Sequence, residues 1–200
     1  MKYKTVVIDL PWPMKTATNP VTLEGSNYHE KLPYESMTTQ EILDFPINDF
    51  ADEDALIFLW VANGRTVDDE PIPALGFRCL QEWGFRYNSM IHWLRNQVTC
   101  LWSPIAMTTE TCLFGWRKQP LDLINSMKNF FEAPRGAHSE KPARFYQLLR
   151  AWTPEPRIDI FARNAHEGFD GWGDEYVGEG PLAPYLKEKM KVSKKTETLP

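Results

Sequence analysis

The sequence predicts an α/β domain built on a largely parallel, covered β-sheet. Two observations lead to this fold class. Short apolar runs rich in β-branched residues alternate with segments of helical character, as expected where helices connect parallel strands. Hydrophobic residues make up 42% of the 200 residues, and 11 Phe, 8 Trp and 7 Tyr supply the apolar area that a folded core requires.

Two apolar runs, residues 3–8 and 55–62, are short and apolar enough to be central strands covered on both faces. Four further segments extend the predicted series: residues 86–94, 111–116, 128–132 and 157–162. In such sheets ligands bind at the carboxyl ends of the strands. The residues that follow each strand are therefore the first candidates for a site.

The first predicted helix covers residues 38–45. It begins with Thr38 and places Glu41 early, as a capped helix does. Glycine and proline residues between positions 64 and 76 interrupt what otherwise reads as one helix over residues 65–83.

The second predicted helix covers residues 139–152. Ser139 can cap it, and Pro142 falls in the first turn, where a missing N–H is harmless. An apolar stripe then follows at Phe145, Leu148, Leu149 and Trp152.

We expect one domain over residues 1–180 and a Lys-rich, flexible tail over residues 181–200. The net charge is −5 in total, of which the tail carries +3 and the domain −8. An acidic domain argues against strong nonspecific affinity for phosphate backbones, which depends on many Lys and Arg contacts. The tail either offsets part of this repulsion or only solubilises the chain.

Neither a membrane span nor a secretory signal is expected. The longest apolar run, residues 55–62, is far shorter than the roughly 18 residues that a spanning helix needs. Near the N-terminus the apolar residues 6–8 meet Asp9 at once, so no secretory apolar region forms. The sequence therefore predicts a cytoplasmic protein.

No metal or disulfide framework is expected. Cys79, Cys100 and Cys112 are odd in number and lack C-x-x-C spacing, and the four His residues are scattered. The sequence also lacks the common glycine-rich nucleotide motifs, the H-E-x-x-H zinc motif and the G-x-S-x-G elbow.

Residues 9–12 combine position with chemistry. Asp9 directly follows the first predicted strand, Pro11 stiffens the backbone and Trp12 adds a flat ring. The Asp9 carboxylate and the Leu10 carbonyl would each accept a hydrogen bond from the exocyclic amine of a base, while Trp12 stacks on its ring. Acceptors on one side favour a pyramidal nitrogen whose lone pair points at an electrophile. Taken alone, the segment also fits a buried turn at a strand end.

Six blocks in one order resemble the N6-adenine methyltransferase family. This family contains the catalytic subunit of the eukaryotic messenger-RNA adenosine methyltransferase and many bacterial and phage DNA enzymes. The blocks are D-L-P-W at 9–12, L-P-Y-x-x-M at 32–37, I-F-L-W-V at 57–61, E-x-C-L-x-G at 110–115, R-x-x-H-S-x-K-P at 135–142, and F-A-R through G-W-G-D-E at 161–175. Leu10 replaces the first proline of the family's D-P-P-W, where the expected contact is made by the backbone carbonyl.

The resemblance implies a Rossmann-like, S-adenosylmethionine-dependent methyltransferase fold that is circularly permuted, with the catalytic block before the cofactor block. It assigns to the adenine substrate the residues Asp9, Leu10, Pro11, Trp12, Tyr34 and Ser139. It assigns to S-adenosylmethionine the residues Asp9, Lys141, Asp159, Phe161, Arg163, Asp174 and Glu175. Three of these have plainer alternatives, because Lys141, Arg163 and Asp159 would also suit solvent-exposed positions.

The implied activity is methyl transfer to the N6 amine of adenine in nucleic acid, with DNA favoured over RNA. Cytosine N4 is an alternative acceptor, because its amine is chemically similar. A non-catalytic, nucleic-acid-binding partner of an active homologue is the alternative from another class. Both homo- and hetero-oligomers are compatible with the resemblance.

Overall fold

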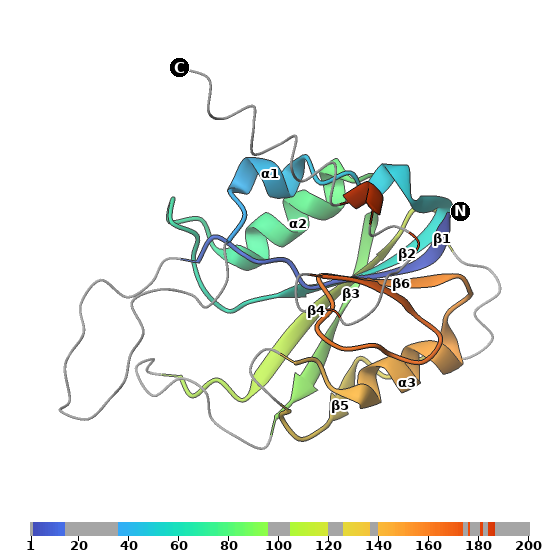
Figure 1. Ribbon diagram of the computed structural model, residues 1–200. Coiled ribbons are helices and arrows are strands. Elements are labelled where there is room, and N and C mark those ends of the chain that lie inside the picture. The colour runs from blue at the N-terminus through green and yellow to red at the C-terminus, as the bar shows by residue number, and fades with distance from the viewer. Residues whose placement is uncertain are drawn as a thin grey trace.

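The apolar runs of the sequence form the middle of a mixed β-sheet that carries helices on both faces (Figure 1). This arrangement comes from a computed structural model, which describes residues 2–14, 36–95, 105–119, 126–136, 140–173, 176, 181 and 184–186. Within these residues the strands are β1 (Tyr3–Ile8), β2 (Ala51–Val61), β3 (Arg86–Leu94), β4 (Thr109–Trp116), β5 (Phe130–Glu132), β6 (Arg157–Ile160) and β7 (Asp170–Trp172).

The strands lie in the order β5-β3-β4-β2-β1-β6-β7. β4 is antiparallel to both of its neighbours, β2 and β3, whereas every other pair is parallel. The expectation of an α/β domain with a largely parallel sheet is confirmed. The first strand in the chain pairs with β6, one of the last, so the D-L-P-W segment and the residues after β6 lie at the same edge.

Helices α1 (Thr39–Leu43) and α2 (Ile72–Glu82) cover one face of the sheet, and α3 (Ala143–Trp152) covers the other (Figure 1). The central strand β2 serves both faces, because successive side chains of a strand point to opposite sides. Ile57 and Leu59 belong to the core under α1 and α2, whereas Phe58 and Trp60 belong to the core under α3. Burial on both faces explains why β2 reads as a continuous apolar run.

The first predicted helix is confirmed with its cap. The Thr38 hydroxyl accepts a hydrogen bond from the Glu41 backbone N–H, and the Glu41 carboxylate accepts one from the Thr38 N–H. The predicted start of the second helix at Ser139 is wrong, because α3 begins at Ala143 with Pro142 as its N-cap. A residue that precedes proline is disfavoured in helical conformation, so Lys141 lies before the helix.

The predicted interruption by glycine and proline is confirmed over residues 65–71, which are not helical, but is wrong within α2. Pro71 is the N-cap and Pro73 lies in the first turn, where helical N–H groups have no intrahelical partner. The helix continues through Gly76, which lies so close to the sheet that an added Cβ would be 2.7 Å from Val61 Cγ1. Close packing on the sheet, and not a helix end, therefore explains this glycine.

Several strand boundaries also differ from the sequence predictions: β4 begins at Thr109 rather than at residue 111, β5 begins at Phe130 rather than at residue 128, and β6 ends at Ile160 rather than at residue 162. β2 begins at Ala51 rather than at residue 55, and the three-residue strand β7 was not predicted. Leu186 is fully buried in the core under α1 and α2, so the packed chain extends past the predicted boundary at residue 180. Residues 187–200 of the predicted tail lie outside the described residues. In the part of the chain that the structure describes, no helix is both long and apolar enough to cross a membrane.

Candidate active site

Residues with reactive side chains meet at one edge of the sheet. Asp9 follows β1, and Phe161 follows the neighbouring parallel strand β6. Because β4 runs antiparallel to β2 and β3, Glu110 near its start lies at the same edge as Arg95, which follows β3. This is the edge where ligands bind in open α/β sheets.

Lys141 joins two carboxylates at this edge. Its ammonium nitrogen lies 2.9 Å from Asp9 Oδ2 and 3.2 Å from Glu110 Oε2. The Lys141 side chain is only 11% exposed, so the alternative of a solvent-facing lysine is excluded. Asp9 is 26% exposed and keeps access to the surface.

Burial and charge act in opposite directions on this pair. Burial raises the pKa of the Asp9 carboxyl above its ordinary value, while the positive charges of Lys141 and Arg163 oppose that rise. Burial alone would lower the pKa of Lys141, but Asp9 and Glu110 raise it above its ordinary value. Lys141 is therefore held as a cation, and its charge favours the ionised form of Asp9.

Trp60 of β2 supports both sides of this pair. Its ring lies under Lys141, with the ammonium nitrogen 5.1 Å from the ring centroid, a cation–π distance. Its backbone carbonyl accepts a hydrogen bond of 3.2 Å from Trp12 Nε1. One residue of the central strand thus contacts both the D-L-P-W segment and the lysine that pairs with Asp9.

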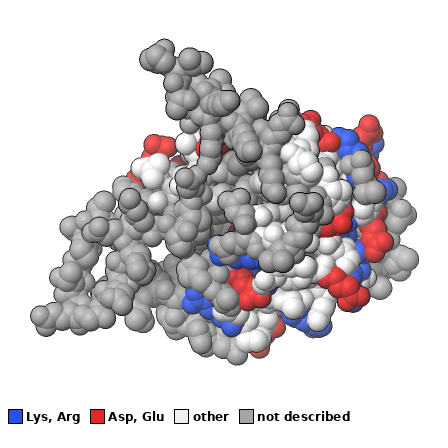
Figure 2. Space-filling view, viewed as in Figure 1, with Lys and Arg blue, Asp and Glu red and all other residues white. Residues whose placement is uncertain are grey.

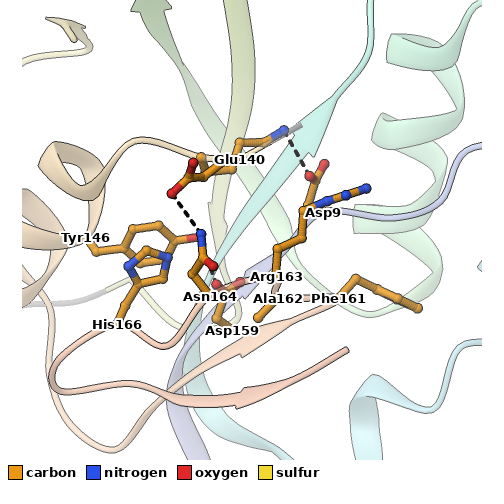
Figure 3. A pocket seen from close by; sticks show the side chains of 10 residues that line it. Asp9, Glu140, Tyr146, Asp159, Phe161, Ala162, Arg163, Asn164 and His166 are labelled. Atoms are coloured by element: carbon orange, nitrogen blue, oxygen red, sulfur yellow. Dashed lines mark hydrogen bonds and ion pairs between the residues drawn. The ribbon is translucent and has the colours of Figure 1, made fainter. Parts of the chain in front are cut away.

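A pocket opens beside Asp9 (Figure 3). The residues that line it are Asp9, Glu140, Lys141, Tyr146, Asp159, Phe161, Ala162, Arg163, Asn164 and His166. Asn164 donates a hydrogen bond of 2.7 Å to Glu140, and the His166 ring stacks on the Tyr146 ring at a centroid distance of 3.4 Å. The lining therefore combines carboxylates, cations and flat rings.

Asp159 forms the floor of this pocket together with Tyr146. It is 3% exposed, which excludes the alternative of a solvent-facing strand residue. The Tyr146 hydroxyl donates a hydrogen bond of 2.8 Å to Asp159 Oδ2. Burial raises the pKa of the Asp159 carboxyl to about 8.

The backbone turns sharply after β6. Phe161 adopts a φ of 62°, a left-handed conformation that is uncommon for a residue with a bulky side chain. Its ring packs against Phe45 and Trp172 at centroid distances of 5.5 and 5.1 Å. Such strained residues cluster at functional sites, and this turn brings Ala162 and Arg163 to the pocket.

A sequence profile of the MT-A70 family matches residues 3–175. The chain belongs to the MT-A70 family. The resemblance inferred from the six blocks is thereby confirmed, and the confirmed fold class is that of the MT-A70 methyltransferase domain.

Individual relatives of this MT-A70 domain carry three kinds of name. The chain is 29% identical over 96% of its length to a probable N(6)-adenosine-methyltransferase MT-A70-like protein of Oryza sativa, of which it covers 26%. It is 23% identical over 87% of its length to the type II methyltransferase M.MunI of a Mycoplasma species, of which it covers 78%. Over 47% of its length it is 27% identical to the N6-adenosine-methyltransferase non-catalytic subunit MTB of Arabidopsis thaliana. The chain thus spans about a quarter of the length of the rice relative.

Five predicted site residues of the MT-A70 domain meet in the structure. Asp9, Lys141, Asp159, Phe161 and Arg163 all line the pocket, although they were assigned from separate parts of the chain. Their roles toward a cofactor stay predictions. Four other predicted site residues, Tyr34, Ser139, Asp174 and Glu175, lie outside the described residues.

The rest of the D-L-P-W segment lies behind the pocket. Leu10 and Trp12 are each 3% exposed and belong to the core under α1 and α2. The Leu10 carbonyl accepts a hydrogen bond of 2.9 Å from the Trp12 N–H, and the Pro11 carbonyl accepts one of 2.9 Å from Met37. A carbonyl oxygen has a second lone pair, so Leu10 can still accept an amine. The predicted stacking of Trp12 stays a prediction.

Sequence reasoning did not predict several residues at this edge. They are Arg95, Glu110, Glu140, Tyr146, Asn164 and His166. Glu110 was recognised as part of a family block but was given no role. Arg95 directly follows a predicted strand, a position where α/β sites gather, and that signal could have found it. Tyr146 lies in the middle of the helix predicted over residues 139–152, where no such signal points to a site.

Proposed function

We propose that this MT-A70 domain transfers a methyl group from S-adenosylmethionine to the N6 amine of adenine in nucleic acid, with DNA as the first candidate. One observation carries the proposal. The Asp9 carboxylate of the D-L-P-W segment lies at a strand end, paired with Lys141, and opens on a pocket lined by groups of both charges. Such an arrangement provides an acceptor for an amine beside a site for a charged cofactor.

The pocket residues fit S-adenosylmethionine. Lys141 and Arg163 are cations that would hold the cofactor carboxylate, and Glu140 and Asp159 are acceptors for its ammonium and hydroxyl groups. Phe161 adds an apolar surface. When bound, the cofactor supplies an electrophilic methyl group on a sulfonium ion. The predicted contacts of Asp174 and Glu175 complete this proposal.

Asp9 would orient the amine that is methylated. A carboxylate offers about four lone-pair sites, and Lys141 contacts Asp9 through Oδ2. The remaining acceptor capacity, together with the Leu10 carbonyl, can hold the two amine hydrogens and direct the nitrogen lone pair away from them. The methylated nitrogen then loses one proton, which Asp9 accepts and passes to water. Alignment and fixed charges of this kind account for most of the rate that such a site provides.

DNA stands before RNA in this proposal because the six sequence blocks also resemble those of bacterial and phage DNA enzymes, and one relative is named a type II methyltransferase. In duplex DNA the base must be flipped out at a cost of about a few kcal/mol. On the face in Figure 2, acidic and basic side chains of the described residues lie interspersed, without one broad basic patch. Because residues 1–180 carry a net charge of −8, which opposes binding to phosphates, we expect target affinity to depend on loops, on the Lys-rich tail or on a partner subunit.

A non-catalytic role is the second candidate, since the relative MTB is named a non-catalytic subunit. The presence of Asp9 and its pair with Lys141 favours the enzyme. RNA adenine and cytosine N4 remain alternative acceptors within the enzyme class.

The test is incubation of the full chain with labelled S-adenosylmethionine and duplex DNA, single-stranded DNA or RNA, followed by nucleoside analysis. We expect N6-methyladenine in DNA, and we expect Asp9→Ala to abolish it while the exposed variant Asp44→Ala retains it. N4-methylcytosine or methylated RNA would replace the proposed acceptor with one of the alternatives. Full activity of Asp9→Ala, or nucleic-acid binding without any transfer by the wild-type chain, would overturn the proposal.

A further inference from the structure

Arg95 is a buried charge at this edge that the proposed chemistry does not use. Its side chain is 7% exposed and lies directly after β3. Its Nη1 donates a hydrogen bond of 3.0 Å to Glu110 Oε1, and its Nη2 donates to the carbonyls of Met107 and Thr109 at 3.2 and 3.4 Å. These bonds fix the guanidinium against the first residues of β4.

Glu110 divides its two oxygens between two cations. Oε1 accepts from Arg95, and Oε2 lies 3.2 Å from the ammonium nitrogen of Lys141. Lys141 in turn lies 2.9 Å from Asp9. Charges alternate along the row Arg95, Glu110, Lys141 and Asp9, which crosses the sheet edge from β3 to β1. With all four groups ionised, the row is neutral.

We propose that Arg95 is a positioning residue for methyl transfer, which acts through Glu110 to keep Lys141 on Asp9. The inference rests on the proposed function for its kinetic readout. By engaging Oε1, Arg95 leaves Glu110 one oxygen for Lys141 and neutralises part of its charge. Without Arg95, both Glu110 oxygens compete with Asp9 for the ammonium group.

Loss of Arg95 should raise the pKa of Asp9. The row would carry a net negative charge, and the negative charge of Glu110 already raises the pKa of Asp9. Movement of Lys141 toward Glu110 would remove part of the attraction that lowers this pKa. Both effects make Asp9 harder to ionise, so activity would require a higher pH.

Several other groups face Asp9 and stay unchanged in this comparison. They are Arg163 after β6, Asp159 on β6, Tyr146 on α3 and Cys112 on β4. Substitution of Arg95 leaves all four groups in place. A second substitution at Glu110, which removes the link between Arg95 and Lys141, therefore tests whether a change in the titration of Asp9 runs through the row.

The experiment compares Arg95→Met, Arg95→Lys and the double variant Arg95→Met with Glu110→Gln. The matched control is Arg157→Met, because Arg157 is equally buried at 6% exposure and also bonds backbone carbonyls, but at the start of β6, opposite the site. Two quantities are measured for each: the pH dependence of kcat/KM, and the Asp9 pKa by NMR of carboxyl-labelled Asp. The Asp9→Asn spectrum assigns the Asp9 signal.

We expect Arg95→Met to raise the Asp9 pKa and the acid limb of kcat/KM by about one pH unit. We expect kcat to fall about tenfold, as for a displaced catalytic group. Arg95→Lys should bring the Asp9 pKa and kcat most of the way back to their wild-type values. The double variant should return the acid limb of kcat/KM to the wild-type pH, because the uncompensated negative charge of Glu110 is gone. Arg157→Met should lower stability without moving either titration.

An Asp9 pKa that is unchanged in Arg95→Met, or that moves equally in Arg157→Met, would overturn the positioning role. If Arg95→Met does not fold, Arg95→Gln, which also removes the positive charge, is compared with Arg157→Gln and decides in the same way. The NMR titration of Asp9 does not require the protein to be an active methyltransferase. A wild-type chain without activity would therefore refute the proposed function, while the NMR result would still decide the role of Arg95.

Discussion

Lys141 and Asp9 form an ion pair of 2.9 Å, although one residue precedes α3 and the other follows β1. The pair exists because Pro142 stops α3 from extending back over Lys141, which leaves the lysine in an extended segment at the carboxyl edge of the sheet. Trp60 then supports the ammonium group from below. The consequence is that the positive charge of Lys141 opposes the rise in the Asp9 pKa that burial causes.

Lys141→Met tests this consequence. Without the ammonium group, Asp9 and Glu110 face each other with no cation between them, so the Asp9 pKa should rise and the acid limb of kcat/KM should move to higher pH. We expect kcat near neutral pH to fall roughly 10²-fold. The control is Lys118→Met, which removes an exposed lysine paired with Glu53. An unchanged acid limb in Lys141→Met would contradict the role given to the pair.

Asp159 should make the stability of the domain depend on pH. Its pKa is about 8 in the folded chain and about 3.9 in an unfolded one. The folded state therefore holds the proton more tightly, and this contribution to stability is complete below about pH 4 and is lost as the pH rises to about 8. The slope is at most about 1.4 kcal/mol per pH unit.

Urea denaturation at pH 5, 6, 7 and 8 measures this effect. We expect the free energy of unfolding of the wild-type chain to fall across this range, and we expect Asp159→Asn to flatten the fall, because an amide does not titrate. The exposed variant Asp44→Asn should keep the wild-type slope. A wild-type slope in Asp159→Asn would show that another group causes the pH dependence.

Tyr146→Phe and Tyr3→Phe form a matched pair. Each removes a hydroxyl that donates to a carboxylate, to Asp159 at 2.8 Å and to Asp170 at 2.7 Å. Each should cost about 1–3 kcal/mol of stability in denaturation, since a partner is left without its hydrogen bond. Tyr146 lines the pocket, whereas Tyr3 lies at the start of β1, away from it. Calorimetry with S-adenosylmethionine should therefore show affinity about tenfold weaker for Tyr146→Phe alone. Equal affinities of the two variants would argue against a cofactor in this pocket.

The central strands and the position of Asp9 could be predicted from local sequence. A short, unbroken apolar run such as residues 55–62 is best accommodated as a strand that is covered on both faces. The first polar residue after such a run marks the end of the strand, where ligands bind. Lys141 and Arg163 could be assigned only through the family blocks. No periodicity or spacing indicates which distant strand end they will meet.

The row from Arg95 to Asp9 could not be predicted, because it depends on register. Glu110 meets Arg95 only because β3 and β4 pair so that Trp93 lies opposite Glu110 and Leu94 opposite Thr109. Sequence patterns fix which face a residue occupies but not which residue lies opposite it. The errors at Ser139 and Gly76 have a different cause. There a local signal, a serine cap or a glycine break, was overridden by Pro142 and by packing on the sheet.

Gly76→Ala tests that override. Alanine is favoured over glycine inside a helix by about 1 kcal/mol, but its Cβ would lie 2.7 Å from Val61 Cγ1 and 3.1 Å from Leu113 Cδ1. Overpacking of this kind costs about 1–3 kcal/mol, so we expect net destabilisation in thermal denaturation. Gln81→Ala, at an exposed position of the same helix, should change stability by less than about 0.5 kcal/mol. A stabilised Gly76→Ala would mean that α2 can move away from the sheet.

Two substitutions of Trp12 distinguish packing of its ring in the core from stacking of its ring on a base. Its ring is 3% exposed and its Nε1 donates to the Trp60 carbonyl at 3.2 Å. Trp12→Phe should therefore cost about 1–3 kcal/mol of stability by leaving that carbonyl without its donor. Trp12→Leu should cost more, about 3 kcal/mol or above, because it also leaves a cavity.

Stacking on a base adds a second effect that denaturation does not measure. If Trp12 also stacks on the adenine, Trp12→Leu should raise KM for the nucleic acid about tenfold, while Trp12→Phe, which keeps a flat ring, should leave it nearly unchanged. Kinetics are measured well below the melting temperature of each variant, so that loss of folded protein does not enter KM. An unchanged KM in Trp12→Leu would make Trp12 a packing residue that holds the D-L-P-W segment against β2, and the stacking predicted from the sequence would be wrong.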